Sequence, residues 1–417
     1  MTRSAGLIVA APSSGAGKTT VTLGLLRALR DAGHDVRGAK SGPDYIDPRF
    51  HEAATGRPCP NLDAWAMGRD MLHGLAAGPG LLIVEGAMGL FDGAADGRGS
   101  VADLARLLGL PVVLVVDAAR MAQSVAPLVA GFANHDPRVR VAGVILNRVG
   151  SPRHEAVLRA ACPLPVLGAV PRDGGLATPS RHLGLVQAAE RTDLEPFLAR
   201  AGRVMAERVD LDALASLAAP LPDAAPPAFD PPAQTIALAS DEAFAFHYPH
   251  LIDGWRRAGA VVTPFSPLAD EAAPEADLVL LPGGYPELHA GRLAANARFL
   301  HSLQGRTVHG ECGGYMVMGD SLTDAEGATH RMAGLLRLET GFTERRLHLG
   351  YRGLTARGGP FHGAWSGHEF HYATVARAEG EPLWNATDAT GTALPPDGLR
   401  CGPATGGFAH LIAPATA

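Results

Sequence analysis

A cysteine between glycines is the first candidate for chemistry in this chain. A β-branched run enters a turn and an apolar segment leaves it, with Cys312 at the apex of Gly310-Glu311-Cys312-Gly313-Gly314-Tyr315. Glycines permit the strained backbone of a strand-to-helix elbow, and the N–H groups of the helix favour a thiolate. The same N–H groups can later hold an oxyanion. A buried structural cysteine is the alternative, but the flanking glycines favour a nucleophile.

A matching base lies near the end of the sequence. Gly406-Gly407-Phe408-Ala409-His410-Leu411-Ile412 is a glycine-led apolar segment, and His410 is its one titratable group. A thiol and a distant histidine that meet in the fold form a nucleophile pair. We therefore predict Cys312 as the nucleophile and His410 as its base.

These residues carry a resemblance. With the upstream motif Leu281-Pro282-Gly283-Gly284-Tyr285-Pro286-Glu287, the cysteine motif resembles the glutaminase domain of class I glutamine amidotransferases, in the branch of the cobyrinate/cobyric acid synthase type. Adjacent glycines suit an oxyanion hole, with a plain turn as the alternative. The expected oxyanion and glutamine contacts are Gly283, Gly284, Gly313 and His371. Ordinary members carry a glutamate two residues after the histidine, whereas this chain has Ile412 there, so what orients His410 is open.

The composition excludes several classes of protein. The chain has 417 residues, which predicts two domains, and its net charge of −6 gives no basic footprint for nucleic acid. Its 4 cysteines are scattered with no Cys-x-x-Cys pair, which argues against a zinc site and a disulfide framework. We see no signal-peptide layout and no apolar run approaching about 20 residues. A cytoplasmic protein without a membrane partner is expected.

The N-terminal segment carries a phosphate-binding pattern. The apolar run 6–11 leads into Pro12-Ser13-Ser14-Gly15-Ala16-Gly17-Lys18-Thr19-Thr20, and helical spacing follows from Val21 to Ala32. Strand, glycine loop and helix predict a P-loop, although Pro12 replaces its usual first glycine. A Rossmann dinucleotide site is excluded, because no third glycine follows at the required spacing. The predicted phosphate ligands are Gly15, Gly17, Lys18, Thr19 and Thr20, and Thr19 also ligates Mg²⁺.

Other polar side chains follow predicted strands of the same domain: Lys40, Asp44, Asp47, Glu85 and Asn147. Parallel strands end at one edge of a sheet, where ligand loops lie. A carboxylate at a strand end beside a P-loop, such as Glu85, is typical of a Mg²⁺ ligand. Turn formation explains the two aspartates equally well. For Asn147, capping a turn competes with reading an adenine edge.

The order of elements predicts an α/β protein of two domains. Residues 1–217 alternate strands with helices, as in a doubly wound parallel-sheet P-loop domain, and 193–216 predict one amphipathic helix that ends it. Residues 218–233 are a proline-rich linker. Residues 234–417 then form an α/β class I glutaminase domain. There, His368 and His371 belong to a strand that lines a cleft, and we disfavour a metal site because no third ligand of suitable spacing appears.

The whole chain resembles the cobyrinic/hydrogenobyrinic acid a,c-diamide synthase family of cobalamin biosynthesis, whose N-terminal domain is similar to dethiobiotin synthetase. Six motifs occur in the order of the family: Ala-Pro-Ser-Ser-Gly-Ala-Gly-Lys-Thr-Thr, Lys-Ser-Gly-Pro-Asp-Tyr-Ile-Asp-Pro, Val-Glu-Gly-Ala-Met-Gly-Leu-Phe-Asp-Gly, Gly-Gly-Tyr-Pro-Glu, Gly-Glu-Cys-Gly-Gly-Tyr and Gly-His-Glu-Phe-His-Tyr. Each motif alone is weak evidence. Their order makes the resemblance specific.

The resemblance implies a carbon–nitrogen ligase that uses ATP and glutamine to amidate the a and c carboxylates of a corrin macrocycle through an acyl phosphate. Cys312 and His410 would release ammonia from glutamine, and Lys40 would stabilise charge on the transferred phosphoryl group. Lys18 and Thr19 would bind ATP and Mg²⁺. Asp44, Asp47 and Glu85 would contact the metal or the substrate carboxylate. Asn147 would contact the adenine. Mg²⁺ is the expected cofactor, and the expected partners are small-molecule substrates. A homodimer is compatible with the resemblance.

Two other functions compete with this one. A cobyric acid synthase would amidate other side chains of the same macrocycle, although its chain is usually longer. A P-loop ATPase switch with a degenerate amidotransferase domain would have lost the Cys–His pair and often carries a basic amphipathic helix. The sequence leaves open whether the corrin ring already holds cobalt.

Overall fold

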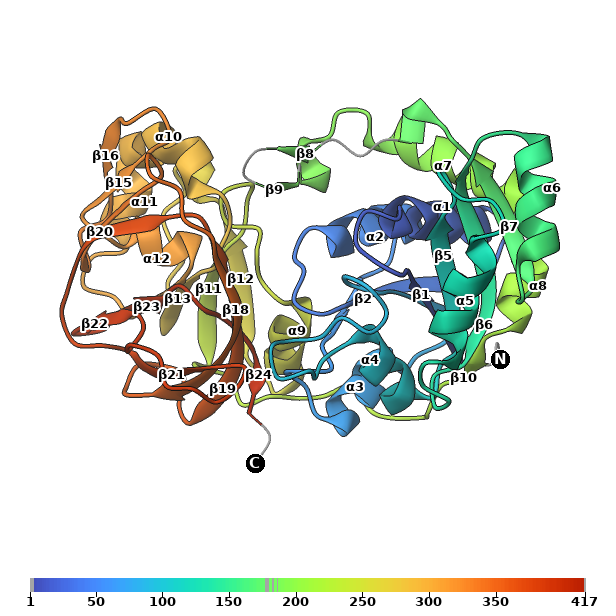
Figure 1. The fold of residues 1–417 in the computed structure, drawn as a ribbon. Helices are drawn as coiled ribbons and strands as arrows, with labels where there is room; N and C mark the ends of the chain where they lie inside the picture. Colours follow the sequence, from blue (N-terminus) through green and yellow to red (C-terminus); the bar gives the residue numbers. More distant parts are fainter. Residues whose placement is uncertain (1–3, 177–179, 182–183, 186, 416–417) are drawn as a thin grey trace. The chain divides into compact units, whose positions relative to one another are not determined.

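The computed structural model describes residues 4–176, 180–181, 184–185 and 187–415, and the chain divides into two compact units, 1–226 and 227–417 (Figure 1). Each unit has its own sheets and its own buried core. No helix of the described residues is long and apolar enough to cross a membrane.

The first unit is built on a parallel sheet with the strand order β3-β2-β4-β1-β5-β6-β7. β10 (Ala219–Pro220) adds to β1 antiparallel. The strands are short runs buried on both faces, as parallel strands require, and β1 lies in the middle with later strands added on either side. The parallel strands are β1 (Ala5–Ala10), β2 (Val36–Ser41), β3 (Asn61–Leu62), β4 (Leu81–Glu85), β5 (Val112–Asp117), β6 (Val141–Val149) and β7 (Val166–Pro171).

Helices cover both faces of this sheet. α1, α2 and α7 pack against the face that carries Leu7 and Val9, whereas α3 and α4 lie on the other side (Figure 1). This is the doubly wound arrangement expected from the sequence. The helices are α1 (Lys18–Asp31), α2 (Asp47–Thr55), α3 (Arg69–Ala76), α4 (Val101–Leu108), α5 (Val125–Asn134), α6 (Pro152–Ala161), α7 (Leu194–Arg208) and α8 (Leu211–Ser216), with short 3₁₀ turns η1 (Gly174–Leu176) and η2 (Ala188–Glu190) and a hairpin of β8 (Ser180–Arg181) and β9 (Gly184–Leu185).

The expectation of a single helix over 193–216 is wrong. The chain leaves helical geometry at Val209, which pairs with Gly168 of β7, and the Asp210 N–H donates to the Leu167 carbonyl at 2.8 Å. Asp210 then starts α8 by accepting a hydrogen bond from the Ala213 N–H. Contacts with β7 therefore outweigh the helical periodicity of the sequence.

The proline-rich segment after α8 is tied to the folded units at both of its ends. β10 pairs with β1, and the Leu221 N–H donates to the Ser4 carbonyl at 3.1 Å. In the second unit, Phe229 is buried, and its N–H donates to the Gly254 carbonyl. The extended prolines thus connect two anchored points.

The second unit has a main sheet with the order β12-β11-β13-β14-β23-β22, parallel except for the edge strand β22. Two four-stranded sheets complete the unit, with the orders β16-β15-β17-β20 and β21-β18-β19-β24. The strands of the main sheet are β11 (Thr235–Ala239), β12 (Val261–Phe265), β13 (Leu278–Leu281), β14 (Val308–Glu311), β22 (Leu399–Cys401) and β23 (Ala404–Gly407). Those of the smaller sheets are β15 (Ser321–Thr323), β16 (Thr329–Arg331), β17 (Arg337–Gly341), β18 (His348–Ala356), β19 (Ala364–His371), β20 (Thr374–Glu379), β21 (Trp384–Asp388) and β24 (His410–Pro414).

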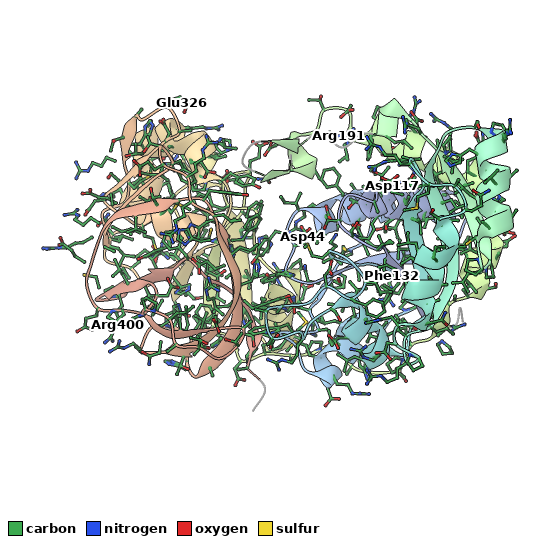
Figure 2. The ribbon with its side chains drawn as sticks, in the orientation of Figure 1. Asp44, Asp117, Phe132, Arg191, Glu326 and Arg400 are labelled. Carbon is green, nitrogen blue, oxygen red and sulfur yellow. The ribbon has the colours of Figure 1, made fainter. Side chains whose placement is uncertain are left out.

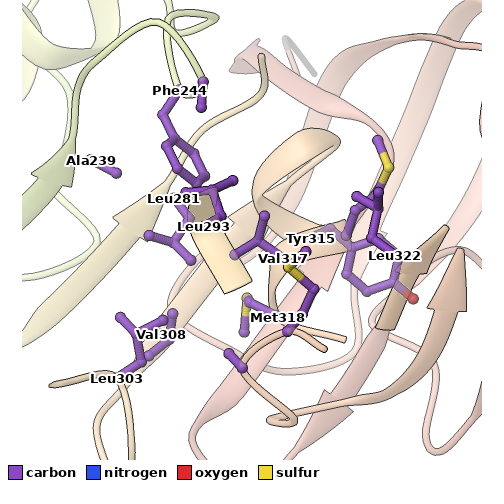
Figure 3. Close-up of a cluster of buried hydrophobic side chains, with 14 of the residues drawn as sticks. Ala239, Phe244, Leu281, Leu293, Leu303, Val308, Tyr315, Val317, Met318 and Leu322 are labelled. Atoms are coloured by element: carbon purple, nitrogen blue, oxygen red, sulfur yellow. The ribbon is translucent and has the colours of Figure 1, made fainter. Parts of the chain in front are cut away.

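The helices of the second unit are short. They are α9 (Pro249–Arg257), α10 (Ala290–Ala295), α11 (Ala297–Ser302) and α12 (Gly313–Val317), with 3₁₀ turns η3 (Pro267–Ala269) and η4 (Pro286–His289). Figure 3 shows the core that α12 shares with the main sheet, where Val317 and Met318 lie among Leu281, Val308 and Leu322. These side chains are fully buried, and each contributes about 1.5–3 kcal/mol by leaving water. The core therefore holds the helix that begins at the candidate nucleophile.

The close contact between α1 and α7 gives a test of the first unit. A Cβ at Gly24 would lie 2.5 Å from Met205 Cγ and 2.7 Å from the Ala201 carbonyl oxygen. Overpacking costs about 1–3 kcal/mol, whereas alanine gains only about 1 kcal/mol over glycine inside a helix. We expect Gly24→Ala to lower the free energy of unfolding, measured by urea titration with circular dichroism.

Gly131→Ala in α5 is the matched control, because nothing lies within 4 Å of a Cβ at that position. The free energy of unfolding of this variant should rise by up to about 1 kcal/mol. Stabilisation of both variants would contradict the close packing of α1 on α7.

Candidate functional site

The loop between β1 and α1 has the backbone that phosphate binding needs. Gly15 and Gly17 adopt left-handed conformations, with φ of 81° and 89°, and α1 starts directly after Gly17. A Cβ at Gly17 would lie 2.2 Å from Asn147 Nδ2, so only glycine fits there. The geometry leaves the first N–H groups of α1 available at the loop, as in a P-loop. Pro12 does not prevent this conformation.

Asn147 braces this loop from the end of β6. Its Nδ2 donates to the Ala16 carbonyl at 2.9 Å, and its Oδ1 accepts the Arg148 N–H at 2.9 Å. These contacts show a holding role in this structure, and the contact with adenine stays a prediction. The Thr20 hydroxyl donates to the Leu176 carbonyl at 3.4 Å, so it too holds a neighbouring segment of the unit in this structure.

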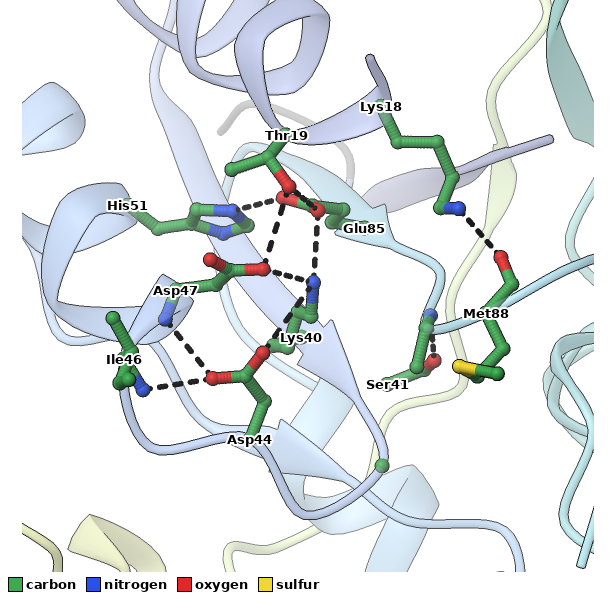
Figure 4. A network of polar contacts seen from close by, with 12 residues as sticks. Lys18, Thr19, Lys40, Ser41, Asp44, Ile46, Asp47, His51, Glu85 and Met88 are labelled. Carbon is green, nitrogen blue, oxygen red and sulfur yellow. Dashed lines mark hydrogen bonds and ion pairs between the residues drawn. The ribbon is translucent and has the colours of Figure 1, made fainter. Parts of the chain in front are cut away.

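Lys18 bridges the loop and the segment that follows β4. Its Nζ donates to the Met88 carbonyl at 2.5 Å (Figure 4). It also donates to the Ser13 carbonyl at 3.4 Å. Burial lowers the pKa of Lys18, and the neighbouring Lys40 lowers it further. The ammonium group is thus held by two carbonyls in a place where anionic oxygens would bind it more strongly.

Four predicted residues meet in one buried cluster beside this loop (Figure 4). Lys40 Nζ pairs with Asp47 and, at 2.8 Å, with Glu85 Oε1. The Thr19 hydroxyl donates to the same Glu85 oxygen at 2.6 Å. Lys40, Asp47 and Glu85 come from β2, α2 and β4, whose ends meet at one edge of the sheet. The sequence-based grouping of these residues is therefore a real spatial cluster.

The charges of the cluster depend on one another. Burial alone would lower the pKa of Lys40, but Asp47 and Glu85 raise it well above its ordinary value. Burial alone would raise the pKa of Glu85, but Lys40 and then His51 hold it well below its ordinary range. Burial and the carboxylate of Asp44 raise the pKa of Asp47. At neutral pH, Glu85 is therefore the carboxylate most firmly ionised next to Lys40.

Asp44, labelled in Figure 2, is the least buried carboxylate of this cluster, with its side chain 29% exposed against 8% for Asp47 and 0% for Glu85. Its Oδ1 accepts the N–H groups of Ile46 and Asp47 at 2.7 and 3.1 Å, which shapes the start of α2. Its Oδ2 lies 3.9 Å from Lys40 Nζ. The turn-forming interpretation thus holds for Asp44, and the group still faces the lysine.

Two residues of this cluster were missed in the sequence. His51 Nε2 lies 2.6 Å from Glu85 Oε2, and its Nδ1 lies 3.5 Å from the Cys59 thiol. Both side chains are fully buried. The available signal was spacing, because His51 follows Asp47 by four residues and so lies on the same face of α2.

In the second unit, Cys312 occupies a strained elbow between β14 and α12. Its backbone has φ of 47° and ψ of −104°, a conformation that costs of order 1–3 kcal/mol for a residue with a side chain. The Cys312 N–H donates to the Gly407 carbonyl of β23 at 2.8 Å. A Cβ at Gly314 would lie 1.9 Å from the Leu281 carbonyl oxygen, which explains one of the glycines of the motif. The predicted elbow is present.

The expectation that the elbow favours a thiolate is wrong for the resting structure. Burial raises the pKa of Cys312 well above its ordinary value, and Glu287 raises it further. The Gly313 N–H bonds to the thiol and lowers the pKa, but by less. One helix N–H does not offset the loss of water around a buried sulfur. Cys312 is a thiol that needs a base.

The glycines of the two motifs lie together around this thiol. A Cβ at Gly313 would lie 3.0 Å from the Gly284 nitrogen and 2.8 Å from Pro286 Cδ. A Cβ at Gly283 would lie 2.2 Å from His410 Cε1. Only glycine therefore fits at Gly283 and Gly313, and the three glycines predicted for the oxyanion form one group with the predicted base.

His410 begins β24 and is buried. Burial, with smaller contributions from His368 and His371, lowers the pKa of His410 to about 3 against a hydrogen bond with the Phe246 backbone, so the ring is neutral at pH 7. Its Nδ1 lies 3.7 Å from Glu311 Oε2, one residue before Cys312. The structure thus brings the predicted base to the strand that carries the predicted nucleophile.

His371 belongs to a second polar group of the unit. Its ring stacks between Phe408 and His348, at centroid distances of 4.0 and 4.5 Å, and its Nε2 lies 2.9 Å from Glu369 Oε1. Arg352 holds the other oxygen of Glu369 at 2.7 Å. Although burial alone would raise the pKa of Glu369, the His371 and Arg352 contacts lower it to about 2.

Within the part of the chain that the structure describes, His348, Glu369 and His371 are the one group of such side chains close enough to share a metal ion. The sequence spacing did not reveal His348 as a third candidate. The geometry does not suit a metal, because the two imidazole rings are parallel within 7° and stacked. A metal lies in the plane of each ring that ligates it, about 2.1 Å from the nitrogen, so parallel stacked rings point past each other.

Comparisons with known proteins cover nearly the whole chain. Residues 7–186 match the CobQ/CobB/MinD/ParA nucleotide binding domain, and residues 235–417 match the CobB/CobQ-like glutamine amidotransferase domain. The hydrogenobyrinate a,c-diamide synthase of Rhodobacter capsulatus is 55% identical over 98% of each chain. The proteins of that name from Brucella anthropi and Rhizobium meliloti are 53% identical over 98% of this chain and 98% and 99% of their own.

The chain belongs to the hydrogenobyrinate a,c-diamide synthase family. The family resemblance and the α/β fold class predicted from the motifs are therefore confirmed. Membership also brings a nucleotide-binding domain and a glutamine amidotransferase domain together in one chain. The roles of the individual site residues stay predictions.

The buried cluster of the first unit gives a test by mutation. Lys40→Met removes the cation from between two carboxylates, and breaking a buried ion pair costs about 3–5 kcal/mol. The loss should be largest near pH 7 and should shrink as pH falls below about 4, toward the depressed folded-state pKa of Glu85. Glu85 has a depressed pKa in the folded state, so its stabilising contribution is present above the unfolded pKa of about 4.3 and is lost as pH falls. Urea titrations of both proteins at several pH values measure this difference.

Arg138→Met is the matched control, because the Arg138 side chain is 72% exposed in its pair with Asp136. We expect no measurable change in its free energy of unfolding, since exposed pairs contribute little. A Lys40→Met variant that unfolds like wild type at every pH would show that the cluster is not held by its charges.

Proposed function

We propose that the protein amidates the a and c carboxylates of hydrogenobyrinic acid, with ATP as the energy source and glutamine as the nitrogen donor. The observation that carries this proposal is the full-length identity of 53–55% to relatives that bear the name of this activity. The geometry supports it from both sides. One unit offers a P-loop with a charged cluster, and the other offers a buried thiol and a neutral histidine whose Nδ1 lies 3.7 Å from Glu311, the residue before the thiol.

The first unit would carry out the activation of the carboxylate. A carboxylate is a poor acyl donor, so the γ-phosphoryl group of ATP is transferred to it, and ammonia then displaces phosphate from the acyl phosphate. Such a transfer needs positioning and charge neutralisation rather than covalent help from the protein. Lys18 would exchange its two carbonyl partners for phosphate oxygens. Lys40 lies next to the loop, where it would stabilise the charge of the transferred group.

The oxygen donors of this site fit Mg²⁺. Thr19 Oγ1, Glu85 Oε1 and Asp47 Oδ2 converge beside the P-loop, with the hydroxyl 2.6 and 3.4 Å from the two carboxylate oxygens. Mg²⁺ prefers oxygen ligands of this kind together with phosphates and water. Thr19, Asp47 and Glu85 would hold the ion, with Asp44 near the substrate carboxylate. When bound, Mg²⁺ neutralises charge on the phosphates.

The second unit would supply ammonia. His410 Nε2 takes the proton of the Cys312 thiol, and the sulfur attacks the side-chain amide carbon of glutamine. The N–H groups of Gly284 and Gly313 would hold the oxyanion. The C–N bond then breaks, His410 returns the proton to the leaving nitrogen, and ammonia departs. Water hydrolyses the remaining thioester with His410 again as the base, which gives glutamate and restores the thiol.

The competing functions have less support. A P-loop switch would need neither the cysteine elbow nor a neutral histidine beside Glu311, the residue that precedes the cysteine. Relatives named hydrogenobyrinate a,c-diamide synthase match the chain over 98% of its length, which favours this activity over a cobyric acid synthase. A cytoplasmic location and a homodimer stay predictions from the sequence.

Cys312→Ala separates the two half-reactions. The wild-type protein with ATP, Mg²⁺ and glutamine should convert hydrogenobyrinic acid into its a,c-diamide, read by mass spectrometry, with cobyrinic acid as the comparison substrate. Cys312→Ala should lose this activity with glutamine and keep it with ammonium chloride, because the ligase site is intact. Equal loss with both nitrogen donors would remove Cys312 from the glutaminase role.

Lys18→Ala tests the ligase site in the same way. We expect loss of amidation with glutamine and with ammonium, because no acyl phosphate forms, while glutamine hydrolysis survives in part. Phosphate release in a single turnover, with macrocycle present and nitrogen donor absent, is the direct measurement. Lys18→Arg should rescue it poorly, since the bulky guanidinium does not replace a compact ammonium. Phosphate release by Lys18→Ala at the wild-type rate would refute the P-loop assignment.

A further inference from the structure

The base of the proposed glutaminase lacks the usual carboxylate after it in the sequence. Ile412 occupies that position, and its side chain is fully buried. The Ile412 carbonyl accepts a hydrogen bond from His250 Nε2 at 2.7 Å. The position two residues after His410 therefore packs the interior of the unit and offers no acid to the ring.

A second carboxylate that acts on His410 electrostatically is already occupied. Glu369 lies near enough to raise the pKa of His410 slightly. Its Oε1 is engaged by His371 and its Oε2 by Arg352, at 2.9 and 2.7 Å. Both of its oxygens are held in a different direction, so Glu369 does not explain the orientation of the base.

Glu311 has the geometry that this role requires. It ends β14 directly before Cys312, and its side chain is only 12% exposed. One oxygen, Oε1, accepts the Leu411 N–H at 3.2 Å, so the carboxyl group is anchored to the peptide that follows His410. The other oxygen, Oε2, lies 3.7 Å from His410 Nδ1. Catalytic hydrogen bonds are often this long in structures without substrate and tighten in the complex.

We propose that Glu311 orients His410 and balances its positive charge when the ring takes the proton of Cys312, in place of the glutamate that other class I amidotransferases carry two residues after the histidine. The inference rests on the proposed function, in which Cys312 and His410 form the nucleophile pair. Glu311 is thus a positioning residue, since it acts through His410 and not on the substrate.

The resting charges agree with this role. Burial raises the pKa of Glu311 to about 8, although the hydrogen bond from the Leu411 N–H favours the ionised form and lowers it. The pKa of His410 is lowered to about 3. At pH 7, both groups are mostly neutral, so no charge attraction draws them together at rest. The reactive form has Glu311 ionised and His410 neutral. The thiol proton then moves to Nε2, Nδ1–H donates to the Glu311 carboxylate, and no further proton has to leave.

Glu311→Gln tests the proposal, because glutamine keeps the size and the acceptor for Leu411 N–H but cannot ionise. We expect kcat for glutamine hydrolysis to fall about 100-fold or more, with KM for glutamine changed less than threefold. Amidation with ammonium chloride should stay at the wild-type level, which shows that the protein is folded. Glu379→Gln in β20, whose side chain is 53% exposed, is the matched control and should behave like wild type.

The pH profile separates positioning from a structural effect. Wild-type kcat should rise with pH through the ionisation of Glu311, and this limb should be absent in Glu311→Gln. The other titratable groups that act on His410 are His368, His371 and Glu369, all from β19. Cys312 itself and Glu287, which acts on its thiol, also titrate. Because all of these groups are unchanged in the variant, a limb that persists in Glu311→Gln belongs to one of them and overturns the proposal.

The outcomes distinguish this inference from the proposed function. Loss of glutaminase activity in His410→Asn together with wild-type kcat in Glu311→Gln would overturn only the role of Glu311. Full activity in His410→Asn would overturn the Cys–His pair itself. A change confined to KM would make Glu311 a glutamine contact and not a positioning residue.

Glu311→Asp keeps the proposal testable if the glutamine variant does not fold, as judged by its activity with ammonium. Aspartate retains the charge but withdraws it by one methylene from His410. We expect the acid limb to persist with a reduced kcat. Wild-type kcat in Glu311→Asp would contradict the proposal, because the carboxylate would then not need to reach the ring.

Discussion

The carboxyl ends of parallel strands all lie at the same end of a sheet, and this constraint decides where each unit of the chain can do chemistry. In the first unit, the ends of β1, β2 and β4 bring the P-loop, Lys40 and Glu85 together. In the second, β13, β14 and β23 end near Gly283, Cys312 and Gly407. Apolar side chains fill the strands themselves, so polar groups are left to the loops at that edge. The two reactions of the protein thus use the same architectural rule twice.

The two units deal with buried ionisable groups in opposite ways. Around Glu85, charges are kept and paired, because Lys40 and His51 offset the loss of water. Around Cys312, charges are avoided, because burial favours the thiol, the neutral imidazole and the protonated Glu311. The difference suits the chemistry. Polyphosphates and Mg²⁺ would bring their own charge to the first site, whereas the reaction proposed for the second moves a proton from a neutral thiol to a neutral imidazole.

The sequence predicted what short-range patterns encode. The P-loop, the cysteine elbow and the strand-end residues Lys40 and Glu85 were all visible, because each motif joins a glycine turn to an apolar run. The break of the helix at Val209 was not visible, since it depends on a bridge to Gly168 of β7. The high pKa of Cys312 was missed for a similar reason. Burial is a property of the whole fold and cannot be read from two flanking glycines.

Partners of catalytic groups were the hardest to predict, because they meet across long distances in the chain. Glu311 lies in the cysteine motif, yet nothing in its spacing indicated a contact with a residue near the C-terminus. The contact follows from pairing: β14 lies beside β23, the Cys312 N–H bonds to Gly407, and β24 starts at His410 shortly after. An acid one residue before the proposed nucleophile can therefore face the proposed base, as an acid two residues after the histidine would. Ile412 is then free to pack the core, and the family pattern changes without removing a carboxyl group from beside the histidine.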